Sequence, residues 1–309
     1  MDNFSFLSGK DVLVTGASGV IGYNLVHSLK NAGANVSALF RNIRGLPFDF
    51  NGVNVMLSDV CDVRQLSGLP KYDAVFHLAG FGQPKLFTQD KVKTFELNTI
   101  PIPTLMSRVK SGGHFLFMSS SEVYGSGSNH KEEDAIQFVD SNRSCYVLGK
   151  LAGEFLAQNS QERNVSVKSI RICLAYGTGF TKDDTRVLTE LIFKGLNHKK
   201  VNLMDDGAAL RKYIYVENAL EMISNIMLSG SHQVYNVGGL ESISIKTLAE
   251  SIAKHTSSTV EFGPAYNFLV GSPNEAGVNI QRYLNEFSAP EFIGIDEGID
   301  KCVEWAKLL

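Results

Sequence analysis

The sequence predicts an α/β fold in which a doubly wound parallel sheet is followed by a smaller, mixed α/β lobe at the carboxyl end. Two observations carry this prediction. Short apolar runs alternate with longer helical patterns from residue 11 to about residue 172, and a glycine-rich turn follows the first apolar run. Such alternation is typical of a parallel sheet covered by helices on both faces. After Tyr176 polar turns and shorter periodic segments replace it, as expected of a second lobe.

Each apolar run predicts a buried strand, and every strand except the third is followed by a stretch able to form a crossover helix. The six predicted strands are residues 12–14, 36–40, 53–57, 74–78, 115–118 and 167–172. A helix over about 217–228 and a strand at 234–237 are predicted to return to the main sheet. The amphipathic segment 295–309 is predicted to cap the small lobe. We therefore divide the chain into a dinucleotide-binding domain, residues 1–176 with about 211–237 returning to it, and a substrate-binding lobe, residues 177–309.

The composition is that of a soluble globular protein and argues against several kinds of partner. Of 309 residues 44% are hydrophobic and 20% charged, and the net charge is −3, so neither nucleic acid nor an anionic membrane surface is an expected partner. The four cysteines lie far apart without zinc-site spacing, so we expect neither disulfides nor a metal. No apolar run reaches the roughly 18 residues of a membrane span. The amino end also lacks a signal-peptide pattern. We expect a cytoplasmic protein.

A glycine-rich turn, TGASGVIG at residues 15–22, leads from the first strand into the first helix. Gly16, Gly19 and Gly22 would give a tight turn, let backbone amides approach a pyrophosphate, and allow the helix to pack closely on the strand. The helix N-terminus adds a partial positive charge for the phosphates. The pattern favours a Rossmann-type dinucleotide site over a tight turn that binds no ligand.

The end of the second strand indicates which nicotinamide cofactor is bound. A site that prefers NAD usually has an acidic residue there, which bonds the ribose 2′-hydroxyl. Here the strand ends in ALFRN, and Arg41 offers a planar, permanently charged donor suited to a 2′-phosphate. A solvated surface arginine is the alternative. We expect NADP(H), with NAD as the second choice, and Asp59 and Val60 are expected to flank the adenine.

Tyr146 is the tyrosine with a lysine, Lys150, four residues later, so both share one helix face. A free tyrosine has a pKa near 10, and a nearby ammonium, together with the positive charge of the nicotinamide, is expected to bring that pKa into a catalytic range. The fifth strand ends in three serines, at the edge where open α/β sheets bind ligands. From there Ser120 could bond the oxygen that Tyr146 protonates, although strand-end serines also cap turns.

Together these motifs resemble the extended short-chain dehydrogenase/reductases, a family of nucleotide-sugar epimerases, dehydratases, decarboxylases and 4-ketoreductases. The likeness covers almost the whole chain through TGASGVIG, SDV (58–60), HLAG (77–80), Asn98, SSSEVYG (119–125), YVLGK (146–150), RICLAYG (171–177) and RKYIYVENA (211–219). Each motif is weak by itself, but their order is specific.

The resemblance implies roles for individual residues. Ser120, Tyr146 and Lys150 would form the catalytic set, with Asn98 supporting the lysine through its backbone or a water. The substrate, a nucleotide-diphosphate sugar, would contact Ser120, Ser121, Glu122 and Arg211, the arginine gripping the diphosphate. The cofactor would contact Gly16, Ser18, Gly19, Val20, Ile21, Gly22, Arg41, Asp59, Val60, Leu78, Ala79, Gly80, Ser119, Tyr146 and Lys150.

Departures from the family pattern narrow the chemistry. Ser121 stands where 4,6-dehydratases have the aspartate that protonates the leaving hydroxyl, so dehydration is disfavoured. Glu122 and Arg143-Ser144-Cys145 look like the UDP-glucuronate decarboxylases, but that subfamily needs a late arginine, and the stretch 272–278 contains none. Leu174 replaces an asparagine that usually touches the substrate.

Three functions therefore stay open. Arg41 favours a 4-ketoreductase that consumes NADPH to reduce the C4 carbonyl of a 4-keto-6-deoxy nucleotide sugar. A nucleotide-sugar 4-epimerase with bound NAD is the alternative enzyme, and an NADP-binding regulator without turnover is the non-enzymatic one. The relatives often form homodimers through two helices per subunit, so a homodimer is a further expectation.

Overall fold

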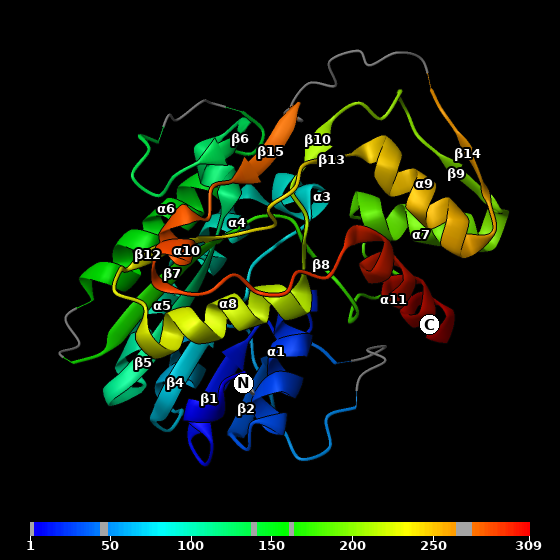
Figure 1. The fold of residues 1–309 in the computed structure, drawn as a ribbon. Helices are drawn as coiled ribbons and strands as arrows, with labels where there is room; N and C mark the ends of the chain where they lie inside the picture. Colours follow the sequence, from blue (N-terminus) through cyan, green and yellow to red (C-terminus); the bar gives the residue numbers. More distant parts are fainter. Residues whose placement is uncertain (1–2, 44–48, 137–140, 161–163, 264–273) are drawn as a thin grey trace.

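A seven-stranded sheet forms the centre of the molecule, and every neighbouring pair in it is parallel (Figure 1). The computed structural model describes residues 3–43, 49–136, 141–160, 164–263 and 274–309. The strand order is β12-β7-β5-β4-β1-β2-β3. The strands are β1 (Asp11–Thr15), β2 (Asn35–Phe40), β3 (Asn54–Leu57), β4 (Tyr72–His77), β5 (Val109–Ser120), β7 (Ser166–Ile172) and β12 (Val234–Val237).

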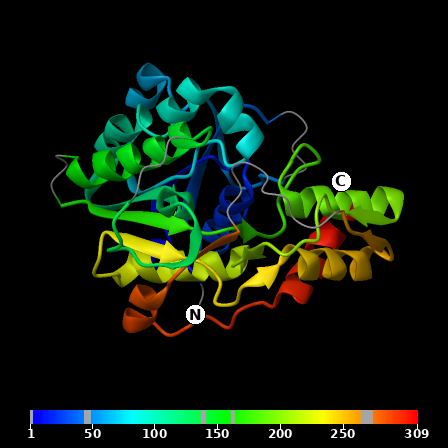
Figure 2. The ribbon, with the colours of Figure 1, turned by 90° about the horizontal axis from the view of Figure 1, so that it is seen from above.

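Helices cover both faces of this sheet (Figure 2). On one face lie α1 (Val20–Asn31) and α8 (Val216–Ser229). On the other lie α2 (Val63–Ser67), α4 (Lys91–Leu97), α5 (Pro101–Ser107) and α6 (Ser144–Asn159). Successive side chains of β1 explain the arrangement, because Val12 and Val14 enter one apolar cluster and Leu13 enters the other. A strand whose two faces are both buried is apolar at every position, as the sequence shows here.

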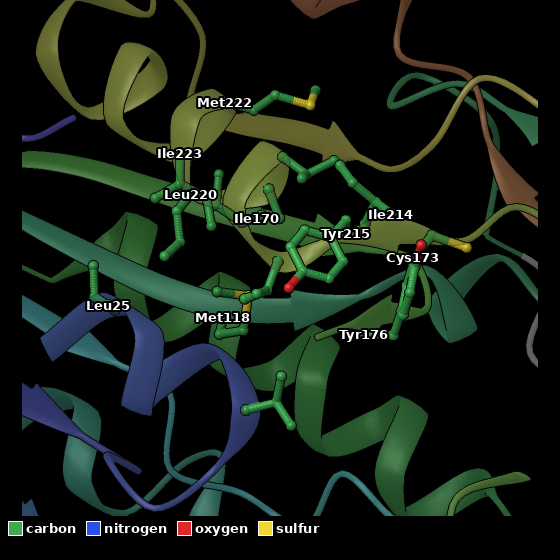
Figure 3. Close-up of a cluster of buried hydrophobic side chains, with 14 of the residues drawn as sticks. Leu25, Met118, Ile170, Cys173, Tyr176, Ile214, Tyr215, Leu220, Met222 and Ile223 are labelled. Atoms are coloured by element: carbon green, nitrogen blue, oxygen red, sulfur yellow. The ribbon is translucent and has the colours of Figure 1, made fainter. Parts of the chain in front are cut away.

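The larger cluster joins the sheet to α8 and to a short two-stranded sheet, β8 (Ala175–Tyr176) with β11 (Ile214–Tyr215). Figure 3 shows Met118 of β5 and Ile170 of β7 facing Leu220 and Ile223 of α8, with Tyr215 beside them. This packing holds β11, and with it the segment that carries Arg211, against the carboxyl half of β5 and β7.

The small lobe is built from short elements that the sequence only outlines. Helices α7 (Val187–His198), α9 (Ile245–Thr256) and α11 (Ile295–Leu308) pack together beside β9 (Lys200–Asn202) and β14 (Thr259–Glu261). A further sheet has the order β13-β10-β15-β6. Its strands are β13 (Ile243–Ser244), β10 (Leu210–Arg211), β15 (Glu275–Val278) and β6 (Gly127–His130). The remaining elements are η1 (Ser5–Leu7), α3 (Pro84–Gln89), η2 (Ser121–Tyr124) and α10 (Gln281–Glu286).

The predicted fold class is confirmed, and two details of the prediction are wrong. The fifth strand is longer than 115–118, because β5 begins at Val109 and ends at Ser120. The helix expected after the second strand is not present in the described part of residues 41–53, whereas five residues after the third strand form α2. The helix and strand predicted to return to the sheet are α8 and β12, and α11 packs on α9 and α7 as expected. The division at residue 176 stays a prediction.

No helix in the described ranges has both the length and the apolar character needed to cross a membrane. Residues 272 and 273 of the stretch compared with the decarboxylases lie outside the described residues.

Helix α6 packs directly on β5 because a glycine occupies the contact. A Cβ at Gly153 would lie 2.3 Å from Cζ of Phe117 and 2.6 Å from the backbone oxygen of Asn98. Any larger residue would therefore push α6 away from β5 and from the end of α4.

We predict that Gly153→Ala destabilises the protein, although alanine normally stabilises an open helix by roughly 0.5–1 kcal/mol relative to glycine. Overpacking against Phe117 and Asn98 should lower the free energy of unfolding by about 1–3 kcal/mol, measured by urea denaturation. The control is Gly82→Ala, since a Cβ there meets no described atom within 4 Å. Equal stability of Gly153→Ala and the wild type would contradict the packing.

Candidate active site

Tyr146 and Lys150 lie in the first two turns of α6, on the face that packs against the sheet. Their side chains are buried, at 8% and 5% exposure. The spacing of four residues places them on one side of the helix, as the sequence predicts. The Lys150 ammonium is 5.6 Å from the centroid of the Tyr146 ring. The helix therefore presents a phenol and an ammonium together at the carboxyl end of β5.

Ser120, the last residue of β5, completes this group. Its hydroxyl lies close enough to the Tyr146 phenol to lower that phenol's pKa, and it accepts a hydrogen bond from the backbone N–H of Glu122 at 3.2 Å. The predicted catalytic trio is thus brought together by β5 and α6. An oxygen atom placed next to both hydroxyls could receive a hydrogen bond from Ser120 and a proton from Tyr146.

The protein's own groups raise the pKa of Tyr146, whereas the expected lowering combined Lys150 with the charge of the nicotinamide. Burial raises the pKa of the phenol well above its ordinary value, and the charge of Glu122 raises it further. The hydrogen bond from Ser120 and the charge of Arg143 act in the opposite direction without cancelling burial. At neutral pH Tyr146 is therefore protonated, the form that can donate a proton.

Lys150 is held by the backbone of β5. Its ammonium donates a hydrogen bond to the carbonyl oxygen of Met118 at 2.7 Å, and burial lowers its pKa to about 7. The predicted support from Asn98, through its backbone or a water, stays a prediction. The Asn98 side chain is fully buried, its Nδ2 donates to Thr94, and its Oδ1 has no hydrogen-bond partner among the described residues. A Cβ on Gly80 would lie 3.4 Å from that Oδ1 and 3.5 Å from the Lys150 ammonium, so both atoms border the same space.

The glycine turn lies at the end of β1 and packs tightly against the end of β4. Gly16 has a φ of 71°, and a Cβ on it would lie 2.6 Å from the backbone nitrogen of Ala79. Gly22 has equally little room, with Gly16's carbonyl oxygen 2.2 Å from its would-be Cβ. A Cβ on Gly19, by contrast, would have its nearest contact at an ordinary 3.6 Å, with the carbonyl oxygen of Gly16. The turn therefore fits a pyrophosphate approaching at Gly19, at the N-terminus of α1.

Two of the predicted adenosine contacts, Arg41 and Asp59, carry opposite charges, and the charge of one affects the pKa of the other. Arg41 is exposed just beyond β2, and its charge helps to lower the pKa of Asp59. The Asp59 carboxylate accepts a hydrogen bond from the Cys61 backbone N–H at 2.8 Å and pairs with Lys93 at 3.1 Å. Asp59 thus remains ionised, while the exposed guanidinium of Arg41 suits a 2′-phosphate.

The other predicted cofactor residues lie around this turn, and the side chain of one of them, Ser119, is already engaged by another residue. Ser119 is buried and its hydroxyl donates to Glu154 at 2.5 Å, so only its backbone is left for a cofactor contact. Val60 is buried in the smaller apolar cluster. Ser18 is exposed, Val20 is buried at the start of α1, Ile21 is half-buried, and Leu78 and Ala79 continue from β4 at partial exposure.

The predicted substrate residues line up along η2 and β10. Glu122 forms an ion pair with Arg143 at 2.9 Å, and Ser121 shares a hydrogen bond with the buried thiol of Cys173. Arg211 is half-buried, and its guanidinium donates to the carbonyl oxygens of Leu210 at 2.8 Å and Asn274 at 3.3 Å. Leu174, which replaces the family's asparagine, has a left-handed φ of 40°.

Residues 12–238 match the NAD dependent epimerase/dehydratase family. The chain belongs to this family. It is accordingly an enzyme that works with a nicotinamide cofactor, as the order of its motifs predicted.

Individual members of the family are similar over nearly the whole chain. A dTDP-4-dehydro-6-deoxy-D-allose reductase from a Streptomyces species is 29% identical over 97% of this chain and 97% of its own. A UDP-glucuronic acid decarboxylase 1 from Arabidopsis thaliana is 26% identical over 94% of this chain and 68% of its own length. Among solved structures, MoeE5 in complex with UDP-glucose and NAD has a TM-score of 0.80 at 25% identity, covering 96% of this chain and 98% of that one.

Within this epimerase/dehydratase site, one aromatic contact was not predicted from the sequence. The ring of Phe87, from α3, stacks on the Tyr146 ring with centroids 4.6 Å apart and planes 16° from parallel. The Arg143 guanidinium lies 5.7 Å from the centroid of Phe87. Phe87 therefore helps to bury the phenol, and this burial is the main cause of the raised pKa of Tyr146. No periodicity signals such a contact, because α3 and α6 are far apart in the sequence.

The lowered pKa of Lys150 predicts a pH dependence of stability. In the unfolded chain this lysine keeps its proton to about pH 10.4, whereas in the folded protein it loses the proton near pH 7. Between these values the unfolded state binds more protons, so the free energy of unfolding should rise with pH, by up to roughly 1.4 kcal/mol per pH unit.

The comparison that isolates this effect is with Lys150→Met, which has no proton to lose at this position. Urea denaturation from pH 7 to 9 should show the wild type gaining stability relative to the variant. A constant difference between the two proteins over this range would show that Lys150 titrates normally.

Proposed function

We propose that the protein reduces the C4 carbonyl of a 4-keto-6-deoxy nucleotide sugar with NADPH. The observation that carries the proposal is the pairing of a protonated, buried Tyr146 with Ser120, combined with the exposed Arg41 at the end of β2. The similarity to a dTDP-4-dehydro-6-deoxy-D-allose reductase over 97% of both chains supports it.

In this reaction the bound cofactor supplies the hydride, and the protein hydrogen-bonds and protonates the carbonyl oxygen. Ser120 donates a hydrogen bond to that oxygen, and Tyr146 gives it a proton as negative charge develops. Donors that are fixed before the reaction favour the transition state over the ground state. Lys150 holds α6 to the Met118 carbonyl through a hydrogen bond and places its amino group beside the phenol ring. Arg211 contacts the diphosphate of the nucleotide sugar.

A 4-epimerase with bound NAD is the second candidate, favoured by the similarity to MoeE5, whose structure contains UDP-glucose and NAD. The Glu122–Arg143 ion pair is the feature that a decarboxylase would share, but the stretch 272–278, where that subfamily has an arginine, contains none. A regulator without turnover is disfavoured because the chain keeps both Tyr146 and Lys150.

A homodimer remains part of the proposal. Helices α4 and α6 contact each other and leave apolar side chains exposed on one surface, which a second copy could cover. These side chains are Val92, Phe95, Leu148 and Phe155.

If the protein is this reductase, adding dTDP-4-keto-6-deoxyglucose should make the purified protein oxidise NADPH in stoichiometric amounts. The oxidation is measured as the loss of nicotinamide absorbance. Tyr146→Phe should reduce the rate by roughly 10²–10⁴-fold, because it removes the proton donor. Affinity for NADPH, measured by fluorescence titration, should stay unchanged.

The matched control is Tyr72→Phe, which removes a phenol at the opposite end of β4. Interconversion of UDP-glucose and UDP-galactose without NADPH consumption would instead identify an epimerase. If neither reaction occurs, the proposed reduction of this 4-keto sugar is wrong.

Cofactor preference gives a second prediction. Arg41→Gln should weaken NADPH binding by about ten- to a hundredfold through the loss of a charge-assisted contact, with NADH binding unchanged, as measured by calorimetry. An acid placed at Phe40 is unsuitable for this test, since Phe40 is 2% exposed and its ring packs on Phe50. Lys71→Gln, exposed at the far end of the sheet, is the control. A wild type that binds NADH as tightly as NADPH would remove the reason for preferring the reductase.

A further inference from the structure

A buried ion pair lies directly behind the Tyr146–Lys150 face of α6. Glu154 and Arg171 are only 5% and 7% exposed. The guanidinium donates two hydrogen bonds to the carboxylate, Nε to Oε1 at 2.9 Å and Nη2 to Oε2 at 2.8 Å. A bidentate pair of this kind is geometrically fixed. The roles derived above for Ser120, Tyr146 and Lys150 make no use of it.

The pair is attached to the strand that ends in Ser120. Lys150 and Glu154 are four residues apart on α6 and contact consecutive residues of β5. The ammonium bonds the Met118 carbonyl at 2.7 Å, and the carboxylate accepts from the Ser119 hydroxyl at 2.5 Å. Arg171 comes from β7, where it is the register partner of Ser119. Helix α6, strand β5 and strand β7 therefore meet at Glu154. The β5 residue at this meeting point is Ser119, which directly precedes Ser120.

Further hydrogen bonds hold Arg171 in place from its other side. Its Nη1 donates to the Tyr124 hydroxyl at 2.9 Å, and that hydroxyl donates to Oδ1 of Asn236, on β12, at 2.8 Å. The Arg171 guanidinium also lies 4.9 Å from the centroid of the Tyr124 ring. The positive partner of Glu154 thus cannot turn away without breaking a buried network.

The charges around Lys150 come from several elements. Tyr146 and Glu154 share its helix, and the imidazole of His77, on β4, is buried close enough for the lysine's charge to help lower the His77 pKa to about 3. Glu122 and Arg143 act on Tyr146. Among these, Glu154 is the carboxylate whose charge acts on Lys150 and favours its ammonium form, against burial.

We propose that Glu154, fixed by Arg171, is a positioning residue that holds Lys150 and the end of β5 in register and sets the charge that Lys150 carries during turnover. This inference rests on the proposed role of Lys150 in the reductase. The paired Arg171 offsets part of the carboxylate's field, so the two charges together fix the protonation of the lysine.

The test is to measure the pKa of Lys150 itself by NMR titration of protein labelled with [ε-¹³C]lysine. The Lys150 resonance is assigned as the one that is absent from the spectrum of Lys150→Arg. Glu154→Gln leaves Arg171 uncompensated and should lower the pKa of Lys150 by about one pH unit or more. Arg171→Met leaves the carboxylate uncompensated and should raise that pKa. The double variant should return towards the wild-type value.

The control is Lys168→Met, which removes another buried charge from β7, at residue 168, without touching Glu154. It should leave the pKa of Lys150 unchanged even if it lowers stability. Glu154→Asp and Arg171→Lys keep the charges and should leave the pKa near its wild-type value, and they give a second comparison where a charge-removing variant does not fold.

Opposite shifts in the two single variants support the inference. Shifts of the same sign, or no shift together with a loss of stability, would overturn it and leave a purely structural ion pair. The measurement needs neither cofactor nor sugar, so a protein that fails to oxidise NADPH would refute the proposed function without deciding this question.

Discussion

The close contact between α6 and β5 is the constraint on which the site depends. Gly153 leaves no space between the helix and Phe117, and Lys150 then reaches the Met118 carbonyl. Because Tyr146 sits on the helix and Ser120 on the strand, their two hydroxyls come close to each other only at this spacing. A shift of about 1 Å at such a contact is enough to spoil catalytic geometry. The catalytic group is therefore a property of the packing as much as of the residues.

The sequence was sufficient where a local pattern is imposed by burial. Strands buried on both faces carry runs of apolar residues, so β1, β2, β4 and β7 could be located, although β7 also buries two charged side chains, and β12 was predicted at its exact bounds. The spacing of Tyr146 and Lys150 could be read as one helix face, and the glycines at 16 and 22 as positions without room for a side chain. Each of these conclusions depends on neighbours within a few residues along the chain.

The rest depended on contacts between distant segments. The two-residue strands β8, β10, β11 and β13 are too short for any periodicity, and they exist because their partners are brought beside them. The stacking of Phe87 on Tyr146 and the pairing of Asp59 with Lys93 likewise join separate elements. The raised pKa of Tyr146 has the same origin, because charge partners can be inferred from the sequence, whereas burial depends on how distant segments pack.

The two proposed enzymatic functions, 4-ketoreductase and 4-epimerase, need Tyr146 in different protonation states at the start of the reaction. A ketoreductase begins each cycle with Tyr146 protonated, since the phenol must give its proton to the carbonyl oxygen. A 4-epimerase begins by taking a proton from a hydroxyl, which requires the phenolate. Burial, with Phe87 stacked on the ring and Glu122 nearby, favours the protonated form. A reduced nicotinamide ring carries no positive charge that would oppose this preference, whereas an oxidised ring does. The chain's own groups therefore favour the protonated phenol that the proposed reductase needs, and the charge of a bound oxidised ring would act in the opposite direction, towards the phenolate.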